Sequence, residues 1–220
     1  MIPLKDINPS RSFPIVNLTI ILICSALWLY EVSLGEYEFN DFIYNFGLVP
    51  VEVFSKPYQL FTHMFLHGSW LHIIGNMWFL WVFGDNVEDR LGKFKYILFY
   101  VLSGLGAAVI QSLVSFLTGA VDVPMVGASG AISGVLGAYL YLFPHARILA
   151  LVPIFFFLTF MELPAVFFIG MWVFIQIING LITLPFAGMG GVAWFAHIGG
   201  FFVGYKLVRV FYRRRLYGKA

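Results

Sequence analysis

Six apolar segments, each close to the length needed to cross a membrane, constrain this chain most strongly. They lie near residues 14–33, 69–85, 95–117, 127–143, 164–184 and 193–211. The hydrocarbon core of a bilayer is about 30 Å thick and takes roughly 20 helical residues to cross. Lipid offers no hydrogen-bond partners to a free backbone, so segments that cross it form helices. The sequence therefore predicts an all-α membrane protein, in which residues 1–220 form one domain of six spans.

Composition agrees with this class and excludes others. Hydrophobic residues make up 60% of the chain and charged residues 11%, whereas soluble domains are roughly 25% charged. Cys24 is the single cysteine, so an intrachain disulfide is excluded, and no Cys/His pattern of the zinc-finger type is present. A net charge of +2 gives little support to nucleic-acid binding. We expect no cofactor and no metal.

One stretch of the chain is ambiguous. The segment from Ile148 to Leu184 has 37 residues, too few for two spans of about 20 residues and a turn. Its first part, Ile148 to Met161, contains Pro153 and is flanked by Arg147 and Glu162. An apolar run of that length is more typical of an interfacial or re-entrant segment than of a span. The count of six spans therefore stands as the prediction.

The basic residues predict the orientation of the spans, because lysine and arginine near span ends prefer the cytoplasm. With the N-terminus inside, Lys56 alone lies outside. The cytoplasmic side then holds Lys5, Arg11, Arg90, Lys93, Lys95, Arg147, Lys206, Arg209, Arg213, Arg214, Arg215 and Lys219. A seventh span would move the cluster at 213–215 outside, which the same rule disfavours. We expect both termini to be cytoplasmic.

This orientation brings four polar residues to one depth. Spans two, four and six run in the same direction, and His72, Asn76, Ser129 and His197 lie within about two turns of their outer ends. His72 and Asn76 are four residues apart and share a helix face. Ser129 begins its span, where unpaired backbone N–H groups favour an anion. The four residues therefore predict a shared polar site.

Serine-dependent amide hydrolysis needs these groups. A base takes the hydroxyl proton, and hydrogen-bond donors stabilise the negative oxygen of the tetrahedral intermediate. Ser129 and His197 can act as nucleophile and base, with His72, Asn76 and the Ser129 N–H as oxyanion donors. Asp122 lies in the loop before span four and Glu162 is predicted on the opposite side. The sequence therefore predicts a Ser/His dyad rather than a triad.

Each of these residues also has a plainer interpretation. Ser129 alone is better explained by close helix packing, and His197 or Asn76 alone by a buried interhelical hydrogen bond. The glycines at the packing positions of spans four and six are Gly130, Gly134, Gly137, Gly200 and Gly204. Polar groups are costly in lipid, so a cluster at one depth favours a functional site. The two interpretations are compatible, because close approach of spans four and six would bring Ser129 toward His197.

These motifs resemble those of the rhomboid intramembrane serine proteases. The matching segments are Gly127–Gly130, His72–Asn76 and Ala196–Gly200, and the resemblance covers nearly the whole chain, including a long first outer loop. It implies that Ser129 is the nucleophile and His197 the base, with the oxyanion site at His72, Asn76 and the Ser129 N–H. It also implies a bundle of six transmembrane helices.

The resemblance also implies partners and a location. The substrates of such enzymes are transmembrane helices of other proteins, cut near the outer face of the membrane. We therefore expect a multi-pass protein in the cell membrane of a prokaryote, in contact with lipid and with protein substrates.

The chain departs from the family pattern at two places. Well-studied bacterial members carry a tyrosine one turn after the serine, packed against the catalytic histidine, and that position is Ser133 here. Phe195, Phe201 and Tyr139 are candidates to replace it, or Ser133 hydrogen-bonds nearby. In the first loop, the frequent Trp-Arg pair of the family is replaced by 58–59, Tyr-Gln.

Two other classes of function compete. His63, His67 and His72 could form a metal or transport site, although Met64 stands where a zinc protease of the zincin type needs its glutamate. Hydrogen bonds within the outer loop explain His63 and His67 more simply. The other competitor is a catalytically inactive rhomboid-like protein that binds membrane proteins, and the presence of both Ser129 and His197 opposes it.

Overall fold

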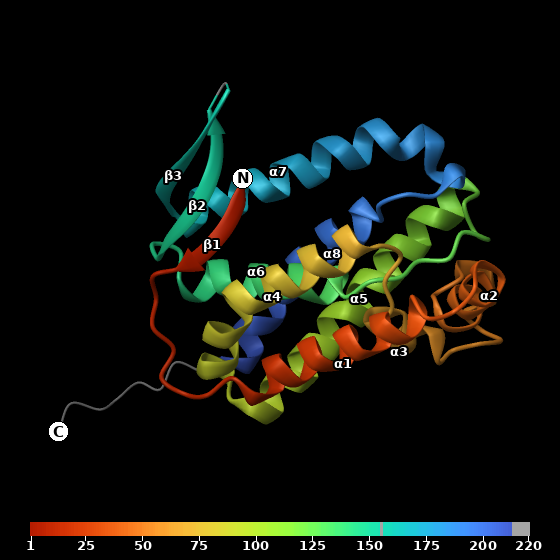
Figure 1. The fold of residues 1–220 in the computed structure, drawn as a ribbon, viewed down its shortest axis with the longest axis horizontal. Coiled ribbons are helices and arrows are strands. Elements are labelled where there is room, and N and C mark those ends of the chain that lie inside the picture. Colours follow the sequence, from red (N-terminus) through yellow and green to blue (C-terminus); the bar gives the residue numbers. More distant parts are fainter. Residues whose placement is uncertain (155, 213–220) are drawn as a thin grey trace.

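The computed structural model describes residues 1–154 and 156–212 and is mostly helical. Six helices agree closely in position with the six apolar segments, and five short helical segments and three strands complete the described fold (Figure 1). The long helices are α1 (Ile15–Glu31), α4 (Trp70–Leu91), α5 (Lys93–Thr118), α6 (Ser129–Leu142), α7 (Ala165–Thr183) and α8 (Trp194–Phe211). The short helical segments are α2 (Glu36–Phe46), η1 (Pro50–Glu52), α3 (Gln59–Thr62) and η2 (His63–Phe65) between α1 and α4, with η3 (Leu184–Met189) extending α7.

Two of the helical segments are long and apolar enough to cross a membrane, judged by their length and composition alone. They are Lys93–Thr118, with a mean hydropathy of 2.0, and the continuous Ala165–Met189, with 2.1. The remaining helices are shorter or less apolar.

The structure corrects the prediction of an all-α fold at the ambiguous stretch. The described residues of this stretch form no helix; they belong to an antiparallel hairpin of β2 (Arg147–Ile154) and β3 (Phe157–Pro164). The N-terminal strand β1 (Ile2–Asp6) pairs with β2, giving a sheet in the order β1-β2-β3. Pairing within the sheet satisfies the backbone N–H and C=O groups of this run, which is too short to cross a membrane as a helix. The sheet lies at one end of the bundle, and α2 and α3 lie at the other (Figure 1).

Helix α6 forms the centre of the bundle and contacts α4, α5 and α8. Residues 130–139, ten of its fourteen, are buried. Its contact with α8 is the closest in the fold, because the backbones themselves touch. A Cβ atom on Gly200 would overlap the carbonyl oxygen of Gly130, and one on Gly204 would overlap Gly134. The glycines therefore determine how near the two helices approach, as the sequence predicted.

A buried carboxylate joins α1 to α4. Glu88, 1% exposed, accepts hydrogen bonds from the backbone N–H groups of Val16 (3.2 Å) and Asn17 (2.8 Å) at the start of α1. Asn17 donates in turn to the Leu80 carbonyl at 3.0 Å and accepts from the Tyr96 hydroxyl at 2.8 Å. These bonds satisfy N–H groups that the helix itself leaves unpaired and fix α1 against its neighbours.

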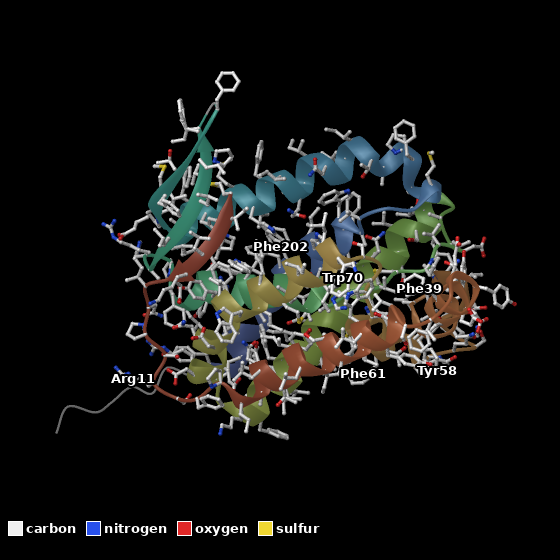
Figure 2. All side chains as sticks on the ribbon, viewed as in Figure 1. Arg11, Phe39, Tyr58, Phe61, Trp70 and Phe202 are labelled. Atoms are coloured by element: carbon white, nitrogen blue, oxygen red, sulfur yellow. The ribbon has the colours of Figure 1, made fainter. Side chains whose placement is uncertain are left out.

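Basic residues gather at the sheet end of the bundle. The Lys95 amine donates to the Phe211 carbonyl at 3.1 Å, and the Arg90 guanidinium lies 5.0 Å from the centre of the Phe143 ring. Figure 2 shows Arg11 at this end and Tyr58 at the other. This segregation agrees with the charge pattern used to orient the chain, whereas the basic cluster at 213–215 lies outside the described residues.

We expect Gly200→Ala to destabilise the protein, because the added methyl group meets the α6 backbone, which has nowhere to move. Overpacking of this kind typically costs about 1–3 kcal/mol. Gly170→Ala in α7 is the matched control, since nothing lies within 4 Å of its would-be Cβ. Unfolding in a mild detergent, followed by circular dichroism, measures both. Equal stability of the two variants would show that the α6–α8 contact is not tight.

We expect β1 to dock more firmly as the pH falls from 7 to 5. Asp6 accepts hydrogen bonds from Asn86 (2.7 Å) and from the Tyr139 hydroxyl (2.8 Å), and burial raises its pKa to about 6. An unfolded aspartate has a pKa of about 3.9, so the docked state binds the proton more tightly and is favoured below pH 6. Hydrogen exchange of the β1 amides, corrected for intrinsic rates, should slow at pH 5.

The control for this pH effect is Asp6→Asn, which removes the titrating group and keeps a hydrogen-bond acceptor. Its β1 exchange should not differ between the two pH values. If the variant retained the pH dependence of the natural protein, Asp6 would not be its source.

Candidate active site

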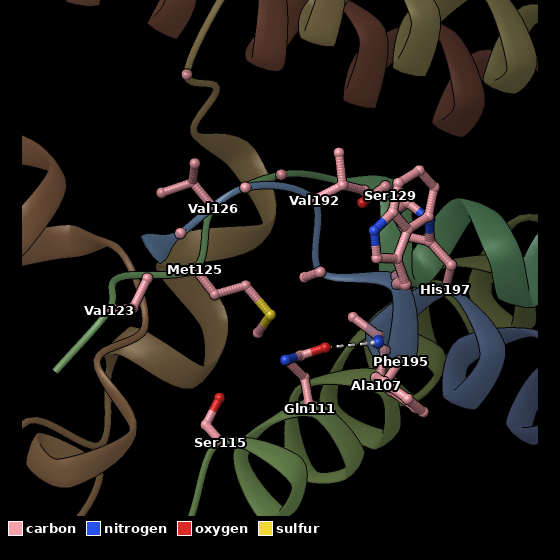
Figure 3. A pocket seen from close by; sticks show the side chains of 18 of the residues that line it. Ala107, Gln111, Ser115, Val123, Met125, Val126, Ser129, Val192, Phe195 and His197 are labelled. Carbon is pink, nitrogen blue, oxygen red and sulfur yellow. Dashed lines mark hydrogen bonds between the residues drawn. The ribbon is translucent and has the colours of Figure 1, made fainter. Parts of the chain in front are cut away.

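Ser129 and His197 line one cavity of 780 Å³, together with His72 and Asn76. Ser129 is the first residue of α6, and His197 lies in the first turn of α8. The close α6–α8 contact brings these two helix starts to the same end of the bundle. In Figure 3 the two side chains lie together at one end of the cavity, and Ser115 lies farther away. The structure thus brings together all four residues that the sequence singled out.

His72 directs one ring nitrogen toward the residues before Ser129. Its Nδ1 accepts a hydrogen bond from the Gly68 N–H at 3.4 Å, so in the neutral ring the proton is on Nε2. A Cβ atom on Gly127 would lie 2.6 Å from this Nε2. Ser69 caps α4 by accepting from the His72 N–H at 3.2 Å, which fixes the turn that carries the ring.

Asn76 presents an unused donor at the same place. The residue is 8% exposed, and its Nδ2 has no hydrogen-bond partner among the described residues. The Nδ2 lies 3.6 Å from the position that a Cβ of Gly127 would take. A buried amide without a partner costs free energy, so its presence in a cavity beside a helix start indicates a binding role.

The loop before Ser129 is held by the first loop of the chain. Gly127 donates its N–H to the His63 carbonyl at 2.9 Å, and Met125 pairs with Leu48 through two backbone hydrogen bonds of 2.8 and 2.9 Å. Gly127 has a φ of +125°, a conformation that side-chain-bearing residues rarely adopt. Glycine is therefore needed here both for the backbone and for the space beside His72.

His197 is held by residues that the sequence analysis missed. Its Nδ1 lies 2.8 Å from Oε1 of Gln176 in α7, and its ring contacts the rings of Trp172 and Trp194, each with a centroid separation of 6.0 Å. A single glutamine in a mostly apolar span was the available signal, since polar residues within spans usually face the protein interior. Pairing it with His197 required the tertiary structure.

Ser133 occupies the position of the family's tyrosine but does not support the His197 ring. Ser133 donates its hydroxyl to the Ser129 carbonyl at 2.6 Å, within its own helix. Of the proposed replacements, Tyr139 donates to Asp6 at 2.8 Å and Phe201 stacks on Tyr205. The two tryptophans thus contact the His197 ring in place of the tyrosine.

A second glutamine fixes the start of α8. The Gln111 Oε1 atom, from α5, accepts a hydrogen bond from the Ala196 N–H at 3.1 Å (Figure 3). Helix N-terminal N–H groups lack partners within the helix, so this bond anchors the turn that carries His197.

Gln59, which belongs to one of the two departures from the family pattern, connects several parts of the first loop by hydrogen bonds. Its buried side chain accepts from the Val49 N–H at 3.2 Å and donates to the carbonyls of Tyr44 (3.1 Å) and Asn45 (3.2 Å). The single neutral amide thus ties three points of the loop beside the cavity.

The histidines of the alternative metal site are not arranged as a ligand set. The His63 Nδ1 is paired with the Gln59 carbonyl at 2.8 Å, and burial lowers its pKa to about 4. His67 is buried, and the centroid of its ring lies 5.1 Å from that of His72. Neither nitrogen of the His67 ring has a hydrogen-bond partner among the described residues. Among the described residues, no group of three or more His, Cys, Asp or Glu side chains could hold a metal ion. The simpler explanation for these histidines, a hydrogen bond within the first loop, is confirmed for the His63 ring. It does not hold for the His67 ring.

Comparison with known proteins gives the family. Residues 55–214 match the Rhomboid domain family. This chain belongs to the rhomboid family. It is 31% identical over 137 residues to a putative rhomboid protease of Bacillus subtilis (strain 168), covering 60% of this chain and 64% of that protein. Rhomboid proteins are integral membrane proteins, and the family consists generally of intramembrane serine proteases.

Two further relatives show the breadth of the family. The chain is 36% identical over 110 residues to the chloroplastic Rhomboid-like protein 11 of Arabidopsis thaliana, covering 49% of this chain and 38% of that protein. It is 27% identical over 137 residues to a rhomboid protease of Providencia stuartii, covering 56% and 49%. The rhomboid chain described here therefore spans between 38% and 64% of the length of these three relatives.

Proposed function

We propose that this rhomboid protein is an intramembrane serine endopeptidase that uses a dyad of Ser129 and His197. The observation that supports the proposal is the set of residues that line one cavity. A serine at a helix start and a histidine line it with the unpaired amide of Asn76. A packing role for Ser129 does not explain why the buried Nδ2 of Asn76 in the same cavity lacks a partner among the described residues.

The proposed reaction begins with proton transfer from the Ser129 hydroxyl to Nε2 of His197, as the serine oxygen bonds to the substrate carbonyl carbon. Negative charge develops on the carbonyl oxygen, where the Nδ2–H of Asn76, the Nε2–H of His72 and the Ser129 N–H can donate to it. His197 then returns its proton to the departing amine as the C–N bond breaks. A water molecule, deprotonated by His197, releases the acyl group from Ser129.

The surroundings favour this chemistry without an acidic residue. No Asp or Glu lines the cavity among the described residues. A charge in a low-dielectric site interacts strongly with nearby dipoles, so fixed neutral donors can stabilise an oxyanion that exists only briefly. A permanent carboxylate at the same depth would carry a large desolvation cost.

We also propose that the six long helices span the membrane, with the sheet end cytoplasmic and the cavity near the outer face. The segregation of basic residues to the sheet end supports this orientation. The substrates would be transmembrane segments of other membrane proteins. We keep the cell membrane of a prokaryote as the proposed location, although the relatives include proteins named chloroplastic and mitochondrial.

We expect purified protein in liposomes to cleave a reporter transmembrane substrate, and Ser129→Ala and His197→Ala each to abolish cleavage. Loss of either partner removes the activated nucleophile. Ser112→Ala, at a buried serine outside the cavity, and His145→Ala, at an exposed histidine, are matched controls that should cleave normally. Cleavage that persists in Ser129→Ala would exclude the serine mechanism. An inactive binding protein would bind the reporter without cutting it.

We expect Asn76→Ala to lower kcat by roughly 10²- to 10³-fold, the typical loss for one oxyanion donor. KM should change little, because the donor acts mainly on the charge that develops in the transition state. Asn45→Ala is the matched control, since within the part of the chain that the structure describes its side chain donates to Asp41 in the first loop and does not line the cavity. A rise in KM at unchanged kcat would instead make Asn76 a substrate-binding residue.

A further inference from the structure

Gln176 is the one buried polar side chain of α7, a helix that the structure describes throughout. The other buried residues of this helix are Ala165, Phe168, Ile169 and Gly180. The glutamine is 6% exposed, and its amide makes two hydrogen bonds. Its Oε1 lies 2.8 Å from the His197 Nδ1, and its Nε2 donates to the Trp172 carbonyl at 3.2 Å.

We propose that Gln176 is a positioning residue for His197, occupying with a neutral amide the place that an acidic residue holds in a catalytic triad. The inference rests on the proposed protease function and concerns how the base is made competent. Gln176 is not among the residues that line the cavity, so it acts on the site through its hydrogen bond to His197.

The two hydrogen bonds of the amide determine which nitrogen of His197 carries the proton. The Trp172 carbonyl can only accept, so the amide nitrogen faces it and the amide oxygen faces His197. The oxygen can only accept, so the His197 Nδ1 must donate, and Nδ1 therefore bears the proton. The neutral ring then has its lone pair on Nε2, the atom that must take the proton of Ser129.

The same hydrogen bond supports the ring after proton transfer. The imidazolium keeps its Nδ1–H directed at the amide oxygen, whose partial negative charge stabilises the cation. Trp172 and Trp194 pack against the ring, so rotation would cost both packing and the hydrogen bond. An amide gives this support without the desolvation cost of burying a carboxylate.

The hydrogen bond also joins two helices that otherwise meet over a small area. Gln176 belongs to α7, which runs along the edge of the bundle (Figure 1), and His197 belongs to α8. A Cβ on Gly180, one turn after Gln176, would lie 3.3 Å from the Trp194 Cβ. Orientation of the base therefore depends on α7 being packed at this turn.

Labelling by a fluorophosphonate tests the proposal, because the probe reports activation of the serine without a substrate helix. Gln176→Leu should slow labelling by about 10- to 100-fold, part of the roughly 10²- to 10⁴-fold that a general base contributes. Asn179→Leu, which removes an amide from the same helix away from the cavity, is the matched control and should label like the natural protein. Equal labelling of Gln176→Leu and the natural protein would overturn the proposal.

Gln176→Glu provides a readout that a merely structural role would not move. A carboxylate keeps the acceptor and favours the imidazolium, so labelling should persist at high pH while its acid limb moves to higher pH. The other ionisable groups of the cavity are His72 on α4 and His63 on η2; among the described residues, α5, α6 and α7 contribute none to its lining. A pH profile identical to that of the natural protein would contradict a contact with His197.

The nitrogen NMR spectrum of His197 shows which ring nitrogen carries the proton, and it tests the proposal even if Gln176→Leu fails to fold. In ¹⁵N-histidine-labelled Ser129→Ala protein, assigned by comparison with a variant that also carries His197→Ala, the neutral ring should be protonated at Nδ1. Protonation at Nε2 would overturn the proposal. If the natural protein neither labels nor cleaves, the protease function fails instead, whatever the tautomer of His197.

Discussion

The contact between the backbones of α6 and α8 is the constraint on which the rest of the structure depends. Gly130 and Gly134 face Gly200 and Gly204 so closely that a methyl group on Gly200 or Gly204 would overlap the α6 backbone. Ser129 and His197 lie at the starts of these helices, so the distance between the proposed nucleophile and base follows from the packing. In the proposed function, the glycines serve packing and chemistry together.

Hydrogen bonds from neighbouring residues then orient the side chains and backbone that this contact brings together around the cavity. His63 holds Gly127 through its backbone carbonyl, Gln111 anchors the first turn of α8, and Gln176 bonds to His197. The supporting side chains are neutral at this depth, as expected where a buried charge is expensive. Among the described residues, the Nδ2 of Asn76 has no hydrogen-bond partner, and it lies where the proposed reaction develops negative charge.

The sequence predicted the helices and the gathering of the polar residues well, because both follow from local signals. Apolar length gave the helix positions, and shared depth gave His72, Asn76, Ser129 and His197. The sheet was missed because Ile148–Met161 is a continuous apolar run without alternation, and its partner strand begins at Ile2. Gln176 was missed as a partner of His197 because the two lie 21 residues apart on different helices. Contacts of this kind are decided by tertiary packing, which no local pattern encodes.

The most direct test of the central claim is to locate the residue that reacts with a fluorophosphonate. The natural protein, reconstituted in liposomes, would be labelled to completion, digested and analysed by tandem mass spectrometry. The account predicts one phosphonyl adduct, on Ser129, that does not form in His197→Ala. An adduct on another residue, or one on Ser129 that forms equally fast without His197, would contradict it.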